Sequence, residues 1–250
     1  MPLLREVLKQ KKRLEENLLI RPTLRVYESY LKRFKEELGS ERKAAVKVLD
    51  YLTEIMKESQ PLVEKLIEER KRKGKIKNPD QARKTIAGNN FQGLVLYSLI
   101  KNVELLNLPD NLILLKTKNH ELVKKHATIK VSGELQKPDL DLIVFSTSPE
   151  KPIVIFSCKT SLRERAGQTY RWKLLIDIAK NCPTLKKKYL IEYPSEREVK
   201  VGLITADFYD ELQNPQQRGM ITFFDFAYAT KPSSTRPFSL VIDDLSSLFR

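Results

Sequence analysis

Two short apolar segments separated by a polar turn constrain the fold of this chain more than any other feature. The segment KPDLDLIVF begins at Lys137, the turn STSPEKP follows it, and IVIFSCK then runs to Lys159. Short apolar runs bounded by proline-containing turns are typical of buried β-strands. We therefore predict two strands that pair as a β-hairpin.

Polar side chains gather at one end of this hairpin. Alternate residues of a strand share a face, so Asp139 is grouped with Asp141, and Ser157 with Lys159. Two registers are open: a fold about residue 148 places Asp139 opposite Ser157, with Lys159 on the diagonal, and moving that centre by one residue places Asp139 opposite Lys159. In either register a carboxylate meets an ammonium group.

Carboxylates beside a lysine suit metal-assisted chemistry on a phosphate. Mg²⁺ takes oxygen ligands, usually one or two carboxylates together with substrate phosphate oxygens and waters. A neighbouring lysine can stabilise an attacking hydroxide or the charge that grows on phosphate. The alternative interpretation is a surface hairpin that ends in a structural ion pair.

The same residues resemble the core of PD-(D/E)xK nucleases, with Pro138 and Asp139 before the first strand and Lys159 closing the second. The continuation is similar to the branch of type II restriction endonucleases that cut CCGG or CCNGG sites, since an Arg-Glu-Arg triplet begins at Arg163, four residues after the lysine. The resemblance covers residues 138–177. It implies an α/β (α+β) fold with a mixed β-sheet nuclease core flanked by helices.

The resemblance also implies an activity and a set of roles. The activity is Mg²⁺-dependent phosphodiester hydrolysis at a palindromic site in double-stranded DNA that contains CCGG. Asp139 binds the metal together with Asp141, Ser157 fills the acidic position of the motif, and Lys159 supports the attacking water.

Arg163, Glu164 and Arg165 are the candidate base readers. The planar guanidinium of arginine matches guanine O6 and N7, and a carboxylate accepts a hydrogen bond from cytosine N4. The alternative interpretation is an exposed helix start, where a glutamate is favoured by the helix dipole and the arginines are merely solvated.

One departure from the branch concerns the second metal ligand. The branch takes its missing carboxylate from the next helix, seven residues after the triplet, and here that position is Trp172. Asp177 lies about 140° further round the helix, on the wrong face, and Gln168 is a weak ligand. The remaining candidates are Asp141, Glu134, an acid on another segment, or none, and the last would mean an inactive site.

The charge of the chain favours a polyanionic partner. Its 250 residues include 46 Lys and Arg against 32 Asp and Glu, a net charge of +14. Each phosphate that a cation neutralises releases counterions and adds affinity, so nucleic acid is the expected partner.

No apolar run approaches the ~20 residues of a membrane span. Cys158 and Cys182 are too few for a disulfide framework, which favours a reducing compartment, the prokaryotic cytoplasm under the resemblance.

Two regions are expected along the chain: a helical N-terminal region at 1–77, for dimer and DNA contacts, and the catalytic domain at 78–250. In the first, Pro22 begins a helix that Gly39 ends, and Pro61 begins another.

A further helix is expected to begin at Asn78 and to be interrupted at Gly88. Gln92 lies on this helix, at the position where nuclease cores often carry an acid. Later strands are expected at Lys188–Glu192, Val199–Thr205 and Ile221–Tyr228, and a loop at Gln213–Gly219.

A palindromic site requires two identical readers, so a homodimer or a higher homo-oligomer is expected. A cognate methyltransferase would protect the same site but need not bind the enzyme. Two other functions remain open. A structure-selective repair or recombination nuclease would use the same core without reading bases, and an inactive sequence-specific DNA-binding protein would keep the triplet but not the metal site.

The base-reading role of the triplet gives a direct prediction. Arg163→Ala removes one bidentate donor and is expected to lose discrimination at one C:G pair, at a cost of about 1–3 kcal/mol. Competition between the expected site and variants with one base pair changed measures this. An equal loss of affinity for every DNA sequence would rule out the role.

Overall fold

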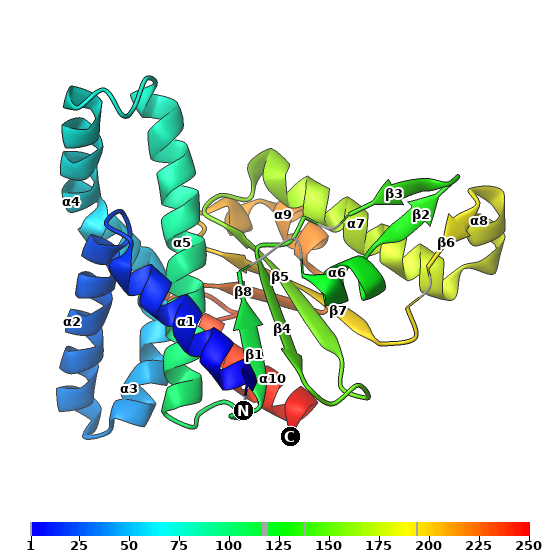
Figure 1. Cartoon of the computed structure of the whole chain (residues 1–250), viewed down its shortest axis with the longest axis horizontal. Helices are drawn as coiled ribbons and strands as arrows, with labels where there is room; N and C mark the ends of the chain where they lie inside the picture. Colours follow the sequence, from blue (N-terminus) through cyan, green and yellow to red (C-terminus); the bar gives the residue numbers. More distant parts are fainter. Residues whose placement is uncertain (1, 117–119, 138, 194) are drawn as a thin grey trace.

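A mixed β-sheet lies between an N-terminal group of helices and a smaller C-terminal helical layer in the computed structural model (Figure 1). The structure describes residues 2–116, 120–137, 139–193 and 195–250, with only the backbone path at 2–4 and 163–166. In the N-terminal half the helical elements are α1 (Pro2–Glu16), α2 (Arg21–Leu38), α3 (Glu41–Val48), η1 (Leu49–Tyr51), α4 (Leu52–Arg72) and α5 (Pro79–Glu104).

The sheets and the remaining helices follow in the second half. The strands are β1 (Leu112–Leu115), β2 (Ile129–Val131), β3 (Glu134–Gln136), β4 (Leu142–Ser146), β5 (Ile153–Lys159), β6 (Ile191–Glu192), β7 (Val199–Thr205) and β8 (Phe226–Ala229). The helices are α6 (Glu121–His126), α7 (Arg163–Asn181), α8 (Pro183–Lys188), η2 (Glu211–Gln213), α9 (Pro215–Ile221), η3 (Phe238–Leu240) and α10 (Val241–Phe249).

The larger sheet has five strands in the order β1-β4-β5-β7-β8. β1, β4 and β5 pair antiparallel, whereas β5, β7 and β8 pair parallel. Every residue of β4 is buried, which requires cover on both faces of the sheet. α5 supplies part of this cover through its contacts with β1 and β5. The predicted α/β class, with a mixed sheet and an all-helical N-terminal part, is confirmed.

The β4–β5 hairpin adopts the second of the two registers considered from the sequence. Leu142 pairs with Phe156, and the Asp141 N–H donates to the Phe156 carbonyl at 2.9 Å. Continued by three residues beyond the Leu142–Phe156 pair, this register sets Asp139 against Lys159. The charged end of the hairpin is therefore fixed by the strand pairing itself.

Helix boundaries follow local signals at several positions. Pro22 lies in the first turn of α2, and Gly39 follows the helix in the left-handed conformation with φ 64°. The Ser40 side chain caps α3 by accepting from the Lys43 N–H, and Asn78 caps α5 by accepting from Gln81.

Two predicted helix boundaries are wrong. Pro61 lies inside α4 rather than at its start. Both Pro61 and Lys57, whose carbonyl loses its helical donor, face solvent, so water can satisfy the carbonyl while the opposite face stays packed. Gly88 does not interrupt α5. A helical glycine costs only about 1 kcal/mol, which is less than the gain from the buried residues that follow it.

Three C-terminal predictions also need correction, while Val199–Thr205 is confirmed as β7. The segment expected as a loop at Gln213–Gly219 forms the end of η2 and most of α9. The last strand is shorter than Ile221–Tyr228, because its first residues finish α9 and turn, leaving Phe223 45% exposed. Most of Lys188–Glu192 is likewise not a strand, since α8 ends at Lys188 and β6 holds two residues.

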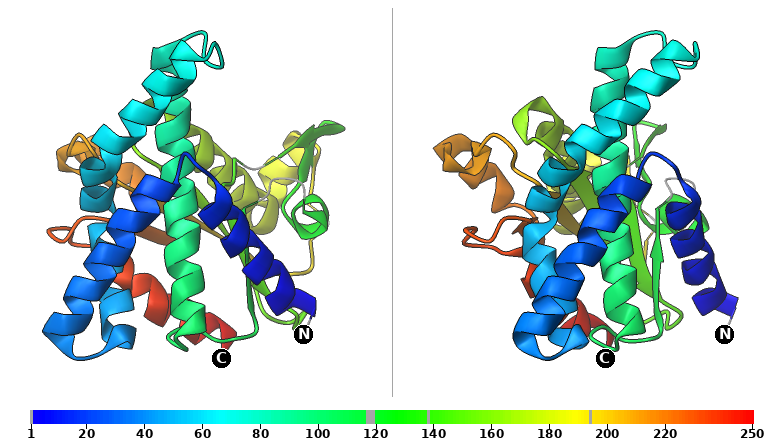
Figure 2. Two further views of the ribbon diagram at one scale, coloured as in Figure 1. Left: turned by 60° about the vertical axis from the view of Figure 1, so that its left-hand side comes forward. Right: turned by 90° about the vertical axis from the view of Figure 1, so that its left-hand side faces the viewer.

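The α4–α5 helical hairpin stands clear of the sheet at its tip, as the turned views show (Figure 2). The tip carries the basic segment Arg70–Lys77, with sequence RKRKGKIK. The described helices include none that combines the length and apolar character needed to cross a membrane.

The packing of β7 against β5 gives a stability prediction. A Cβ atom at Gly202 would lie 2.3 Å from Phe156 Cε1, and the Phe156 ring is fully buried. Gly202→Ala should lower the free energy of unfolding by about 1–3 kcal/mol in urea denaturation. Gly88→Ala is the control: its Cβ meets nothing within 4 Å, and alanine should stabilise α5 by about 0.5–1 kcal/mol. Equal effects of the two substitutions would contradict this packing.

Candidate active site

Two carboxylates converge on one ammonium group where β5 ends. Lys159 Nζ donates to Asp139 Oδ2 at 2.8 Å and to Asp141 Oδ2 at 3.4 Å. The Lys159 side chain is 11% exposed and that of Asp141 5%, whereas Asp139 is 24% exposed. Asp139 is therefore the carboxylate more open to an incoming ligand.

Asp141 is held in place by donors from three directions. Its Oδ2 accepts from the backbone N–H of Cys158 at 2.8 Å and from the Ser157 hydroxyl at 3.4 Å. Its Oδ1 accepts from Gln92 Nε2 of α5 at 2.7 Å. A buried carboxylate needs such donors to offset the loss of hydration. Gln92 thus contributes to the site as a donor that orients an acid.

The Lys159 ammonium remains charged in this setting. Burial lowers its pKa, but Asp141 and Asp139 outweigh that effect, so the pKa of Lys159 lies above its ordinary value. A lysine that stays protonated near neutral pH cannot take up a proton as a general base. It can stabilise negative charge on a phosphate or on an attacking oxygen.

Among the described side chains of α7, the one that contacts Ser157 is Thr169, whose hydroxyl donates to Ser157 Oγ at 3.0 Å. Trp172 is buried in the core, and its Nε1 has no hydrogen-bond partner among the described residues. Asp177 pairs instead with Lys173 at 2.7 Å.

The other ligand candidates also stay apart from the hairpin end. Gln168 is exposed, and Glu134 lies on β3 in the separate three-stranded sheet. Among the residues that the structure describes, no group of three or more His, Cys, Asp or Glu could hold a metal ion.

The candidate base readers begin α7, the helix that follows β5 along the chain. The helix starts at Arg163, four residues beyond Lys159. The side chains of Arg163, Glu164 and Arg165 lie outside the described part of the chain, as does Pro138. The backbone alone shows that the triplet occupies the first turn of a helix.

Two contributors were missed in the sequence. Lys116 follows β1, and burial lowers the pKa of its ammonium group although Cys158 and Asp141 act against this. It is thus a second cation near Asp141. The sequence signal for Lys116 was its position at the end of an apolar strand, which is also the position of Lys159 on β5. Thr169 gave no signal, because its contact with Ser157 depends on how α7 packs.

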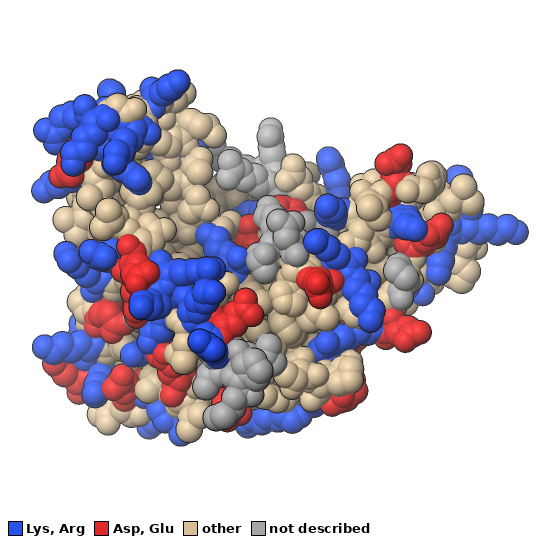
Figure 3. Space-filling model, in the orientation of Figure 1, with Lys and Arg blue, Asp and Glu red and all other residues tan. Residues whose placement is uncertain are grey.

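A groove of about 710 Å³ opens beside Lys159. Residues at and beyond the end of β5, including Ser161, line one side, and α4 and α5 line the other, including Ile67 and Lys84. In the space-filling view, basic side chains cluster over the tip of the α4–α5 hairpin, at the upper left (Figure 3). The segment Arg70–Lys77, which lies at this tip, carries six Lys and Arg residues.

A mixed sheet with paired carboxylates and a lysine at a hairpin end is the arrangement that the resemblance to nuclease cores implies. Residues 118–249, just over half of the chain, match the family model described as BsaWI restriction endonuclease type 2. The chain is therefore a type II site-specific deoxyribonuclease, and it belongs to the BsaWI restriction endonuclease family. No curated protein matches the chain.

The family agrees with the resemblance drawn from the motif, which among individual enzymes of its branch suggested BsaWI first. The match spans Asp139, Asp141, Lys159 and the start of α7. Membership of a restriction endonuclease family implies binding to double-stranded DNA.

The burial of β5 predicts different reactivity of the two cysteines. Burial raises the pKa of the Cys158 thiol well above its ordinary value, so less thiolate is present at any given pH, and reagents cannot reach it. Cys182 is only partly buried. Ellman's reagent at about pH 8 should detect one thiol per folded chain and two after denaturation, and Cys182→Ser should abolish the native signal. Two fast-reacting thiols in the folded protein would contradict the placement of β5.

Proposed function

We propose that this enzyme is a Mg²⁺-dependent endonuclease that cuts double-stranded DNA at a palindromic site containing CCGG. The observation that carries the proposal is the contact of one buried ammonium, Lys159, with the carboxylates of Asp139 and Asp141, four residues before the helix that begins with Arg163. Chemistry and base reading then occupy consecutive parts of one polypeptide segment. As a restriction enzyme it would act in the prokaryotic cytoplasm.

The residues present fit a magnesium ion. Mg²⁺ needs one or two protein carboxylates and completes its shell with phosphate oxygens and waters, so Asp139 and Asp141 suffice without a third acid. Their oxygens already converge on one cation, Lys159. When bound, the metal would polarise the phosphate and lower the pKa of a bound water.

The chain's own groups would do the remaining work. Lys159, held protonated by the two carboxylates, would stabilise the charge that develops as water attacks phosphorus and the 3′ oxygen leaves. Ser157 and Gln92 would keep Asp141 oriented, since both donate to its carboxylate. Ser157 at the position of the usual acid then costs a metal ligand but supplies a hydrogen-bond donor to Asp141.

Base reading would come from the first turn of α7. Arg163 and Arg165 supply donors that match guanine, and Glu164 an acceptor that matches the cytosine amino group. A palindrome presents the same bases twice, so a homodimer or a multiple of it would place one α7 start in each half-site.

The α4–α5 hairpin would hold the DNA backbone. It forms one side of the groove beside Lys159, and its tip carries six cations between Arg70 and Lys77. Cations at such a position contact phosphates and place the protein on the duplex without reading sequence. Binding strength should therefore depend steeply on salt.

Digestion of a long natural DNA with Mg²⁺, followed by sequencing of the ends, tests the proposal. The wild type should give discrete fragments whose ends share a CCGG-containing palindrome. Lys159→Ala is the matched variant: it removes the ammonium and should abolish cutting while keeping sequence-specific retardation on a gel. Cleavage only of branched or damaged DNA, or specific retardation without any cleavage by the wild type, would contradict the proposal.

A further inference from the structure

One loop runs alongside the whole connection between the catalytic lysine and the helix that carries the base readers. The Ala206 N–H donates to the Lys159 carbonyl at 3.0 Å, and the Phe208 N–H donates to the Thr160 carbonyl at 3.3 Å. These contacts continue the β5–β7 pairing, in which Lys159 faces Thr205. Residues 206–212 therefore continue this strand pairing alongside the segment that connects β5 to α7.

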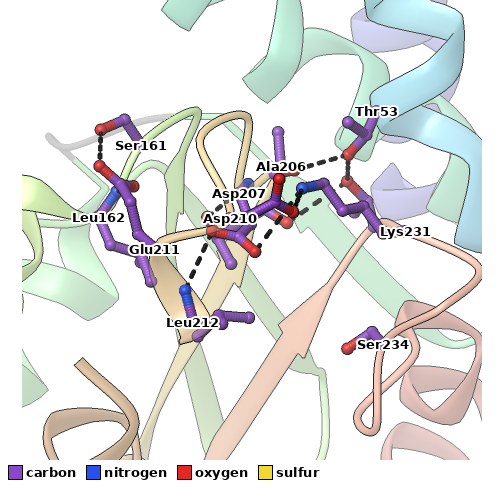
Figure 4. Close-up of polar contacts among 12 residues, drawn as sticks. Thr53, Ser161, Leu162, Ala206, Asp207, Asp210, Glu211, Leu212, Lys231 and Ser234 are labelled. Atoms are coloured by element: carbon purple, nitrogen blue, oxygen red, sulfur yellow. Dashed lines mark hydrogen bonds and ion pairs between the residues drawn. The ribbon is translucent and has the colours of Figure 1, made fainter. Parts of the chain in front are cut away.

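Glu211 completes this alignment at the start of α7. Its carboxylate accepts from the Ser161 hydroxyl at 2.8 Å and from the backbone N–H of Leu162 (Figure 4). Leu162 occupies the N-cap position of α7, and its own side chain offers no acceptor. A carboxylate from a different segment thus accepts from the N–H of the N-cap residue, as the N3 acid does in a capping box, and its charge also favours the helix dipole.

The loop itself is built to hold Glu211 there. Asp207 and Asp210 both adopt left-handed backbone conformations, with φ 48° and 53°, which non-glycine residues rarely do without support. Lys231 provides that support, since its Nζ lies 2.7 Å from Asp210 Oδ1 and 3.7 Å from Asp207 Oδ2 (Figure 4). Asp207 in turn accepts from the Leu212 N–H at 3.3 Å.

The loop is also fixed to the helical hairpin. The Thr53 hydroxyl of α4 donates to the Ala206 carbonyl at 2.8 Å and lies 2.8 Å from the Thr230 hydroxyl. Thr53 and Thr230 are completely buried. The position of Glu211 is therefore set by two supports, Lys231 and α4.

From these contacts we infer that Glu211 is a positioning residue for sequence discrimination: it fixes the first turn of α7, and with it Arg163–Arg165, relative to Lys159. The inference rests on the proposed base reading by that triplet. Glu211 would not touch DNA. It would restrict the directions in which the readers can point, so that a wrong base pair leaves a reader unsatisfied instead of being accommodated.

Glu211→Ala tests this through the fidelity of cleavage. The measured quantity is the ratio of kcat/KM on the cognate site to kcat/KM on sites with one central C:G pair changed. We expect this ratio to fall at least tenfold, mainly because the altered sites are cut faster relative to the cognate one. Glu211→Gln keeps an acceptor oxygen and the side-chain shape, and should restore part of the ratio.

Asp210→Ala is the matched control. Asp210 is the neighbouring carboxylate, 71% exposed, and it bonds Lys231 rather than the start of α7. In Asp210→Ala, Lys231 still pairs with Asp207 and Thr53 still holds Ala206, so the discrimination ratio should stay within about twofold of the wild type. A ratio unchanged in Glu211→Ala, or lowered equally in Asp210→Ala, would overturn the role of Glu211.

Amide hydrogen exchange separates this inference from the proposed function. If the wild type discriminates no sequence at all, the proposed function fails, and exchange at 162–166 then decides the role of Glu211 by itself. Faster exchange of these amides in Glu211→Ala, with exchange in β5 unchanged, supports the positioning role. Unchanged exchange at 162–166 overturns it.

Discussion

The register of β4 against β5 is the constraint on which the site depends. A strand that slips by one residue turns every side chain to the opposite face. Every residue of β4 and all of β5 except Lys159 are buried, so a slip would take each apolar side chain out of the space that it fills and would separate the polar ends, and the close packing of the core therefore holds the register. The same force that forms the core thus brings Asp141 to Ser157 and Asp139 to Lys159.

Burial of the charged end has a cost that the surrounding donors offset. Removing one partner of a buried ion pair leaves an uncompensated charge, at about 3–5 kcal/mol. Asp141 avoids this through a backbone N–H, an amide and an ammonium, and two of these three groups come from β5 itself. The site is therefore as much a product of the strand backbone as of the motif residues.

Local sequence signals predicted the parts of the fold that local physics decides. The ends of α2 at Gly39 and of β5 at Lys159 follow from turn chemistry and hydrophobic pattern. The prediction that Pro61 begins a helix was wrong because a solvent-facing proline can be tolerated inside a helix when the opposite face is well packed. The prediction that Phe223 lies in a strand was wrong because the sequence alone does not distinguish an aromatic residue in a turn from one in a strand.

In the candidate site, too, some contacts follow from local sequence patterns and others depend on how the helices pack. The pairing of Asp139 with Lys159 belongs to one of the two registers that the hairpin allowed, so periodicity alone limited the choice to two. The contacts made by Gln92 and Thr169 depend on where α5 and α7 pack, which no local pattern encodes. The roles of Asp139, Lys159 and Arg163–Arg165 in catalysis and base reading remain predictions.

The ion pair at the hairpin end bears on how a metal ion and DNA would bind. Lys159 pairs with both carboxylates that would receive the metal and offsets one of their two negative charges. Under the proposed function, a divalent cation would compete with Lys159 for these oxygens. A phosphate of the DNA would bring further negative charge and would thereby favour the presence of both cations. Metal and DNA would then bind more tightly together than either does separately.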